Sequence, residues 1–440
     1  MRSPQAILLA IGLLALAACG DDEVILPGER LSVRPGEDGS VIAAAATDVS
    51  AAVVPIALAA PRRLADWPMR VGNAQNDPGH ATLSAAPRRI WTADIGTGDT
   101  RRQRLTADPV SDGARIYTLD SRSTVVATTT GAATAWSRSL VPATERDIDA
   151  SGGGLAVVGG TLFVSTGFGE LHALDAASGA TRWVQRLDAP ITTPKAAGGL
   201  VYLVSRDNRA WALDAGNGRI RWELPALPSA SAMATSPAPA IAGRLAIFPF
   251  ASGEVVATLQ QSGIRVWGAR VAGTRRGIAS SFVGDITGDP VVQNGTVYAG
   301  TTAGRIVALE QSSGARLWTA DEGAASPVVV AGGSLFAVSD RSQLLRLDAA
   351  TGDVIWRSDL PFWRNQRVKR RQGIFAQYGP VLAGGRLWVA SSDGALRGFD
   401  PRTGLLQAQA EIPGGAASRP IAFGDALYVA GRDGQLHAFR

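Results

Sequence analysis

Cysteine is almost absent from this chain of 440 residues, which contains one, Cys19. A single cysteine excludes an intramolecular disulfide, so the fold is predicted to form without one. Histidine is scarce too, with three residues. His172 and His437 occupy the same position of a repeated pattern, GELHALD and GQLHAF, which favours a structural role, and His80 has no obvious partner. Metal-binding clusters, phosphate-binding glycine loops and nucleophile elbows are also missing, so no metal, cofactor or catalytic residue is predicted.

Long hydrophobic runs are missing after the N-terminus. No later segment approaches the ~18 apolar residues that a membrane-spanning helix needs. The formal net charge is only +5, and basic residues are scattered except in two loops. This balance predicts solvated arginines rather than a nucleic-acid surface.

The N-terminus has the three parts of an export signal. Arg2 precedes an apolar run from Ala6 to Ala17, which leads into Leu16-Ala17-Ala18-Cys19. Residues 1–18 are therefore predicted to be a signal peptide. A cysteine at the cleavage site resembles the lipobox of bacterial lipoproteins, which implies a lipid anchor on Cys19. Gly20 follows where an aspartate would resemble an inner-membrane retention signal, so we expect the outer membrane, facing the periplasm. An ordinary signal peptide with an incidental cysteine is the alternative.

Residues 19–64 are predicted to be a lipidated, flexible tether. They are rich in Ala, Val, Ser and Gly and contain few large side chains, so they can bury little apolar surface. A flexible coil of ~45 residues would reach about 35–40 Å, enough to hold a domain away from a membrane.

From about residue 65 the sequence repeats. A tryptophan recurs at the end of one pattern, in LDAASGATRW, LDAGNGRIRW, LQQSGIRVW, LEQSSGARLW and LDAATGDVIW. A spacing of roughly 40–50 residues is typical of propeller blades. Each such unit is too small to bury its own apolar face, so neighbouring units must stack.

Counting the units predicts an all-β, eight-bladed β-propeller of four-stranded blades over residues 65–440. Six units end on a tryptophan, and a seventh has Ala408 in its place. The eighth begins at Arg419 and stops at Arg440 before its outer strand, which the segment around Trp91 is predicted to supply. The two termini would thus share one blade and leave no free sheet edge. The six units with tryptophan end at Trp136, Trp183, Trp222, Trp267, Trp318 and Trp356.

Six units carry a glycine in the turn before the outer strand, and four of them also carry an aspartate there. The aspartates are predicted to accept backbone N–H bonds, and the glycines to adopt positive φ. The aspartates are Asp175, Asp214, Asp348 and Asp400, and the glycines are Gly179, Gly218, Gly263, Gly314, Gly352 and Gly404.

Three connections between blades are long, at 224–236, 269–289 and 358–378, and all should emerge on one face. Elaboration of one face is typical of a binding surface on a repeat scaffold. Arginines and aromatics, which are enriched in protein-binding hot spots, occur in these loops. They include Arg275, Arg276, Arg364, Arg367, Lys369, Arg370, Arg371, Phe362, Trp363 and Phe375.

The repeat unit resembles the PQQ-type repeat of quinoprotein dehydrogenases and of the BamB family. The lipobox, tether and eight units together are similar to BamB, a lipoprotein of the outer-membrane β-barrel assembly (BAM) machine. Residues 228–239 resemble the family's loop that touches the barrel subunit BamA, and 285–292 resemble its second contact segment. The resemblance implies partner contacts at Ala230, Ala232, Met233, Asp285, Thr287 and Asp289. The charge of the long connection adds Arg275 and Arg276 to the predicted contacts.

This resemblance implies a non-catalytic scaffold that binds a BamA-like barrel subunit and other assembly lipoproteins, and that assists nascent outer-membrane proteins. Two residues depart from the family, because Met233 and Thr287 stand where many relatives carry an arginine and an aspartate. A scaffold of another envelope complex and a PQQ-dependent dehydrogenase are the alternatives. The dehydrogenases typically carry an adjacent cysteine pair and a calcium-binding carboxylate cluster, and the sequence shows neither.

Overall fold

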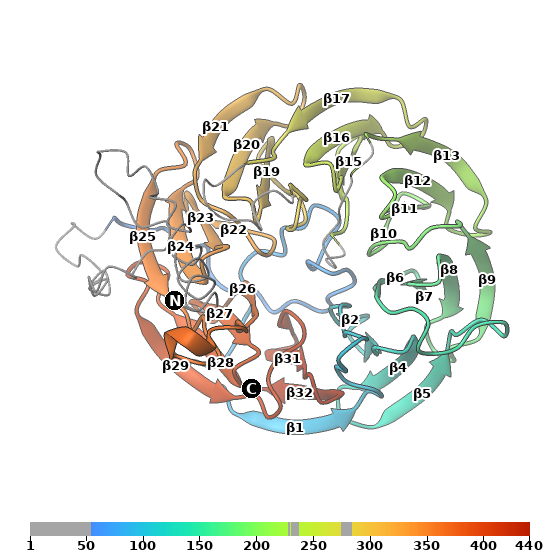
Figure 1. Ribbon diagram of the computed structural model, residues 1–440, viewed down its shortest axis with the longest axis horizontal. Helices are drawn as coiled ribbons and strands as arrows, with labels where there is room; N and C mark the ends of the chain where they lie inside the picture. Colours follow the sequence, from blue (N-terminus) through green and yellow to red (C-terminus); the bar gives the residue numbers. More distant parts are fainter. Residues whose placement is uncertain (1–53, 228, 230–236, 274–283) are drawn as a thin grey trace, which may run out of the picture. The chain divides into compact units, whose positions relative to one another are not determined.

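The computed structural model describes residues 54–440, except 228, 230–236 and 274–283. Eight antiparallel four-stranded sheets follow one another around a ring (Figure 1). In seven of them the strand order is the sequence order, from the inner to the outer edge. The predicted eight-bladed β-propeller is confirmed.

The blades are numbered along the chain. Blade 1 consists of β2 (Val110–Ser111), β3 (Arg115–Leu119), β4 (Thr124–Thr129) and β5 (Thr134–Ser139), and blade 2 of β6 (Gly153–Val158), β7 (Thr161–Thr166), β8 (Glu170–Asp175) and β9 (Thr181–Arg186). Blade 3 consists of β10 (Lys195–Ala197), β11 (Leu200–Val204), β12 (Arg209–Asp214) and β13 (Ile220–Pro225), and blade 4 of β14 (Ala240–Ala242), β15 (Leu245–Pro249), β16 (Glu254–Leu259) and β17 (Arg265–Arg270). Blade 5 consists of β18 (Val291–Gln293), β19 (Thr296–Thr301), β20 (Arg305–Glu310) and β21 (Arg316–Ala320), and blade 6 of β22 (Val329–Ala331), β23 (Ser334–Val338), β24 (Gln343–Asp348) and β25 (Val354–Asp359). Blade 7 consists of β26 (Gln377–Ala383), β27 (Arg386–Ser391), β28 (Ala395–Phe399) and β29 (Leu406–Glu411), and blade 8 of β30 (Ile421–Phe423), β31 (Ala426–Ala430), β32 (Gln435–Phe439) and β1 (Arg89–Asp94).

The ring closes as predicted, through a strand from the N-terminal side. β1 pairs antiparallel with β32 as the outer strand of blade 8, and Figure 1 shows the blue strand beside the red one. Backbone bonds between Arg88 and Arg440 in both directions continue this pairing. Both ends of the repeat region are therefore held in one blade, which has four strands like the other seven.

Each repeat tryptophan joins its blade to the next one. Trp318 of β21 donates its indole N–H to the carbonyl of Ala349, in the turn of blade 6, at 3.0 Å. Its ring lies on Gly352 of that turn, where an added Cβ would come within 2.5 Å of Cε3. Gly352 has φ +79°, so its lack of a side chain serves both the turn and the close approach.

The same indole bond recurs around the ring. The bonded pairs are Trp91–Thr130, Trp136–Ala176, Trp183–Ala215, Trp222–Gln260, Trp267–Gln311, Trp318–Ala349 and Trp356–Pro401. The tryptophans therefore pack between adjacent blades as expected, and the spacing from tryptophan to glycine in the sequence reflects contact across a blade boundary.

Ala408 replaces the tryptophan at the one boundary that has no turn to receive it. Blade 7 precedes blade 8, and in blade 8 the chain ends after β32 while the outer strand comes from residues 89–94. The turn that would accept an indole is thus absent, because β32 and β1 are not consecutive in the sequence. The missing tryptophan follows from the closure of the ring.

The lead-in before β1 packs on the ring over its described residues. Residues 54–64, predicted to be part of a flexible segment, lie against the blades. The stretch 54–83, called the axial segment below, starts beside blade 6, where Arg346 donates to the carbonyls of Val54 and Pro55, and continues into the middle of the ring in Figure 1. Backbone N–H and C=O groups of this segment form hydrogen bonds with the blades. The composition of the sequence does not predict these bonds. Residues 19–53 of the predicted tether lie outside the described residues.

Candidate partner-binding face and the filled channel

The two faces of the ring are built differently. The turns that join the first two and the last two strands of a blade lie on one face, called the turn face, and are short. The middle turn and the connection to the next blade lie on the opposite face, called the loop face. All three long connections predicted from the sequence belong to the loop face. This asymmetry makes the loop face the candidate for partner binding.

The turn face is held by the predicted aspartates. Oδ1 of Asp175 accepts the N–H groups of Ala177 and Ser178, while Oδ2 accepts from Arg182 at 2.8 Å. The hydrogen bond from the Arg182 guanidinium is the main cause that lowers the pKa of Asp175 to about 2. Asp214, Asp348 and Asp400 accept equivalent backbone bonds, and all six predicted glycines have positive φ. The aspartates and glycines are structural, as predicted.

The predicted contact segment at 285–289 is buried in the structure. The exposed fractions of Asp285, Thr287 and Asp289 are 3%, 1% and 1%. Thr287 Oγ1 donates to the carbonyl of Ala324 at 2.8 Å, and Ile286 pairs with Thr301 of β19. The sequence led us to expect surface contacts here, whereas the structure places these side chains inside. A role in partner binding stays a prediction.

The other predicted contact residues belong to two of the long connections. Ala230, Ala232 and Met233, like Arg275 and Arg276, lie outside the described residues. Beside the first group, Leu227 has an exposed fraction of 65%, and its carbonyl accepts from Asn208 Nδ2 at 2.7 Å. A fixed backbone thus presents an apolar side chain on the loop face. Sequence reasoning did not single out Leu227.

Asp289 belongs to a buried charged network near the ring axis. Arg70 of the axial segment reaches Asp289 through Nη1 at 3.1 Å and Asp108 through Nε at 3.0 Å. Asp108 Oδ1 accepts the backbone N–H of Arg419 at 2.9 Å. Burial raises the pKa of Asp289, and the positive charges of Arg70 and Lys195 oppose this. Asp108, Asp289 and Arg419 each stand two residues before an inner strand, so three blades meet at this network.

Lys195 extends the contacts between the axial segment and the blades. Its side chain is fully buried, and Nζ donates to the carbonyl of Asn73 at 3.0 Å and to Oδ1 of Asn76. Burial lowers the pKa of Lys195 to about 7. Asn76 Nδ2 donates in turn to the carbonyls of Pro239 and Pro290. One asparagine therefore contacts blades 3, 4 and 5.

The axial segment forms hydrogen bonds with every blade. From blade 1 to blade 8, the bonds are Trp67 N to Ser111 O, Val157 N to Pro68 O, Lys195 Nζ to Asn73 O, Ile241 N to Ala74 O, Val292 N to Gln75 O, Arg346 Nη1 to Val54 O, Ala81 N to Leu382 O, and Gly424 N to Leu64 O. Most of these bonds reach the ends of inner strands that lead to the turn face. The segment acts as an internal strap that ties the blades together.

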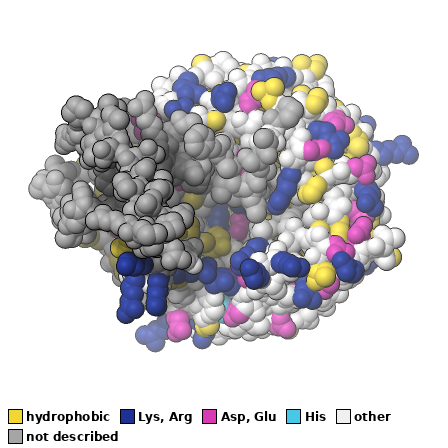
Figure 2. Space-filling model, viewed as in Figure 1, with side chains coloured by type: hydrophobic (Ala, Val, Ile, Leu, Met, Phe, Trp, Pro, Cys, Tyr) yellow, Lys and Arg dark blue, Asp and Glu magenta, His cyan; other side chains and the backbone are white. Residues whose placement is uncertain are grey.

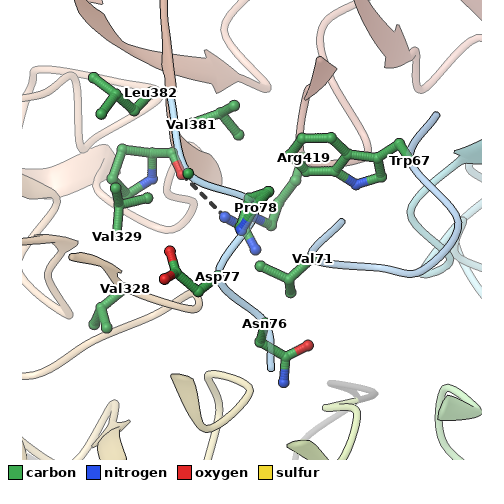
Figure 3. A pocket seen from close by; sticks show the side chains of 12 residues that line it. Trp67, Val71, Asn76, Asp77, Pro78, Val328, Val329, Val381, Leu382 and Arg419 are labelled. Atoms are coloured by element: carbon green, nitrogen blue, oxygen red, sulfur yellow. Dashed lines mark hydrogen bonds between the residues drawn. The ribbon is translucent and has the colours of Figure 1, made fainter. Parts of the chain in front are cut away.

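A small cavity lies beside this strap, between it and the described residues of the blades. Figure 3 shows Asp77, Pro78 and Val71 of the axial segment facing Val328 and Val329, which lead into or begin blade 6. The cavity between the segment and the blades measures about 10 Å³, room for about one water molecule. His80 of the axial segment places Nδ1 2.7 Å from the carbonyl of Ala59, and its Nε2 accepts the N–H of Gly385 at 2.8 Å. His80, which had no obvious partner in the sequence, fastens the strap to blade 7.

A comparison of the sequence identifies its family. The family model described as "Outer membrane protein assembly factor BamB" matches residues 122–358, more than half of the chain. The chain belongs to the BamB family.

Individual relatives agree with this assignment. Outer membrane protein assembly factor BamB of Yersinia pestis is 25% identical over 362 residues, which cover 80% of this chain and 89% of the relative. The protein of the same description from Salmonella typhimurium is 27% identical over 293 residues, which cover 65% of this chain and 71% of the relative. The protein from Escherichia coli is 24% identical over 293 residues, with the same coverage of both chains.

Solved structures show the shared fold. BamB from Moraxella catarrhalis matches with a TM-score of 0.67 at 18% identity, covering 81% of this chain and all of that chain. A europium-containing methanol dehydrogenase matches with a TM-score of 0.64 at 13% identity, covering 83% and 89%. At these identities the likeness concerns the fold alone.

The two remaining histidines of this BamB-family chain occupy equivalent slots, as expected. His172 of β8 faces Glu170, with Nε2 3.2 Å from Oε2, and His437 of β32 places Nδ1 3.3 Å from Thr92 Oγ1. Burial lowers the pKa of both, that of His172 to about 4. Within the described residues, no group of three or more His, Cys, Asp or Glu could hold a metal ion, and no helix is long and apolar enough to cross a membrane.

Proposed function

We propose that this BamB-family chain is a non-catalytic scaffold of the outer-membrane protein assembly machine. The observation that carries the proposal is the family match over 122–358, on a ring whose loop face alone bears the long connections. The scaffold would bind a BamA-like barrel subunit and, through it, other assembly lipoproteins. Nascent outer-membrane proteins would be the cargo of the complex, with this chain assisting their folding and insertion.

The partner surface is proposed to lie over the connections from blade 3 to blade 5. Leu227 provides a described, exposed apolar side chain there, next to Ala230, Ala232 and Met233 in the sequence. Arg275 and Arg276 would add charge from the following connection. In this proposal Asp285, Thr287 and Asp289 support that connection from inside, because all three are buried. Apolar and arginine side chains together are typical of binding hot spots.

A non-catalytic role is supported by the contents of the ring. Among the described residues, the axial segment bonds to all eight blades and lies beside a cavity of about 10 Å³, which has room for about one water molecule. No cofactor is proposed. Alcohol oxidation by the purified chain in the presence of PQQ and calcium, above a heat-inactivated control, would contradict this part of the proposal.

The anchor is proposed to be a lipid on Cys19, which would hold the chain at the outer membrane on the periplasmic side. The experiment that tests the whole proposal is affinity purification of the chain from cell envelopes. We expect the barrel subunit to co-purify. Recovery of a different envelope complex, without the barrel subunit, would favour the alternative scaffold.

A further inference from the structure

The connection between blades 6 and 7 projects a cluster of positive charge. Residues 360–376, called the basic finger, contain five Arg or Lys residues and no Asp or Glu. The chain as a whole has 43 basic and 38 acidic residues, so these five equal its entire formal excess of +5. The cations are Arg364, Arg367, Lys369, Arg370 and Arg371.

The finger has a defined structure of its own. Arg364 N donates to the carbonyl of Gly373 at 3.0 Å, and Phe375 N donates to that of Phe362 at 2.7 Å, which pairs the two arms. Arg364 Nε also reaches the carbonyl of Ile374 across the arms at 3.0 Å. At the base, Phe362 and Trp363 pack edge to face with ring centroids 4.7 Å apart. The charges are therefore presented on an ordered support.

All five cations are exposed to solvent. The tip is a short 3-10 helix, η3 (Val368–Arg370), which buries none of its side chains. Within the part of the chain that the structure describes, none of the five forms an ion pair with a carboxylate, and the Arg371 guanidinium lies over the Trp363 ring at 5.6 Å. In Figure 2, several Lys and Arg side chains project together at the lower left, where the coiled ribbon of η3 lies in Figure 1.

Aliphatic side chains are exposed among these charges. Val368 at the tip has an exposed fraction of 63%, and Ile374 one of 49%. Apolar side chains surrounded by Arg and Lys are the arrangement with which proteins enter the headgroup region of a bilayer. An acidic protein would instead need a cluster of carboxylates matched to five cations within eight residues.

We propose that the basic finger binds the surface of a bilayer containing anionic phospholipids, with the cations on the phosphates and Val368 and Ile374 at the headgroup boundary. This contact lies on the loop face but between blades 6 and 7, away from the connections proposed for the barrel subunit. It would orient the ring relative to the membrane in a way that a flexible tether cannot.

The test is flotation of the full chain carrying Cys19→Ala, so that no lipid is attached, with two kinds of vesicle. One is phosphatidylcholine alone, and the other is phosphatidylcholine mixed with phosphatidylglycerol. The measured quantity is the ratio of the two partition coefficients. Every variant keeps the same N-terminal apolar run and Arg2, so comparing variants, rather than the two vesicle types, removes the uptake that this run causes. We expect clear preference for the anionic vesicles at low salt, and loss of that preference at high salt.

The variant Arg367→Gln, Lys369→Gln, Arg370→Gln is expected to lower the ratio by about a hundredfold, because each cation near an anionic surface contributes about fivefold. A matched variant on or near the turn face, Arg88→Gln, Arg219→Gln, Arg244→Gln, loses the same charge and should change the ratio less than about twofold. Val368→Ser should lower partitioning into anionic vesicles with the charge unchanged. All of these side chains are exposed, so melting temperatures should match wild type.

Two results would overturn the proposal. Equal partitioning of wild type into both kinds of vesicle would leave an acidic protein as the partner of the finger. Equal loss of binding by the finger variant and the turn-face variant would show that only the overall charge matters.

Discussion

Substitution of Gly352 by alanine tests the contact that joins blade 5 to blade 6. The added Cβ would lie 2.5 Å from Trp318 Cε3, and Gly352 has φ +79°. The left-handed conformation alone costs an alanine about 1–2 kcal/mol. Forcing a methyl group against a packed ring adds about 1–3 kcal/mol. We therefore expect Gly352→Ala to lower the free energy of unfolding by about 2–5 kcal/mol.

Gly333 offers a matched control in the same blade. Its φ is +75°, but an added Cβ would meet no atom within 4 Å. Gly333→Ala should therefore cost only the conformational part, about 1–2 kcal/mol. The difference between the two variants isolates the contact with the indole ring.

A double-mutant cycle separates the two contributions at Gly352. Trp318 has an exposed fraction of 8%, so Trp318→Ala alone should cost about 3–5 kcal/mol. Once the ring is gone, Gly352→Ala should cost no more than Gly333→Ala, giving a coupling of about 1–3 kcal/mol. Free energies from urea unfolding followed by tryptophan-independent circular dichroism measure this cycle. Equal costs for Gly352→Ala with and without the indole would refute the proposed contact.

Three further outcomes follow from the same structure. Trp91→Ala should lower the melting temperature as much as Trp318→Ala, because Trp91 bonds to Thr130 and belongs to the strand that closes the ring; an unchanged melting curve would contradict the closure. Burial lowers the pKa of Lys195 to about 7 from 10.5, so above pH 7 the unfolded chain binds more protons than the folded chain. The free energy of unfolding of wild type should therefore rise with pH relative to Lys195→Met, by at most about 1.4 kcal/mol per pH unit, and parallel pH profiles in urea titrations would show that Lys195 keeps its proton. Cys19→Ala should release the protein from the outer membrane or leave it uncleaved, and fractionation identical to wild type would argue against the lipid anchor.

The repeat pattern predicted the architecture because each recurring residue has a defined structural role. The glycine admits both a left-handed turn and the neighbouring indole, and the aspartate ties the same turn through its carboxylate. Even the missing outer strand of blade 8 could be predicted, since Trp91 stands in an outer-strand pattern, although the turn that its indole meets has Ala132 at positive φ in place of the glycine. The reason for Ala408 in place of a tryptophan could not be predicted from its own unit. It depends on the neighbouring blade 8, where no continuous turn joins β32 to β1.

The axial segment could not be predicted because it has no periodicity. Its bonds to the blades come from backbone groups and from isolated side chains such as Asn76 and His80, which only the closed ring brings within reach. The same limit applies to the 285–289 segment. A polar sequence next to a long loop favoured exposure, whereas Arg70, distant in the sequence, pairs with Asp289 in the interior.

Binding of the purified chain to the soluble periplasmic region of the barrel subunit tests the scaffold role most directly. Isothermal titration calorimetry should compare wild type, the loop-face variant Leu227→Glu with Met233→Glu, and the turn-face variant Ile264→Glu. Leu227 and Ile264 have similar exposed fractions, 65% and 62%, so neither substitution should unfold the ring. We predict that wild type binds, that the loop-face variant binds more than about tenfold more weakly, equivalent to about 1.4 kcal/mol, and that Ile264→Glu binds as wild type does. No binding by wild type, or weakening by Ile264→Glu alone, would contradict the account.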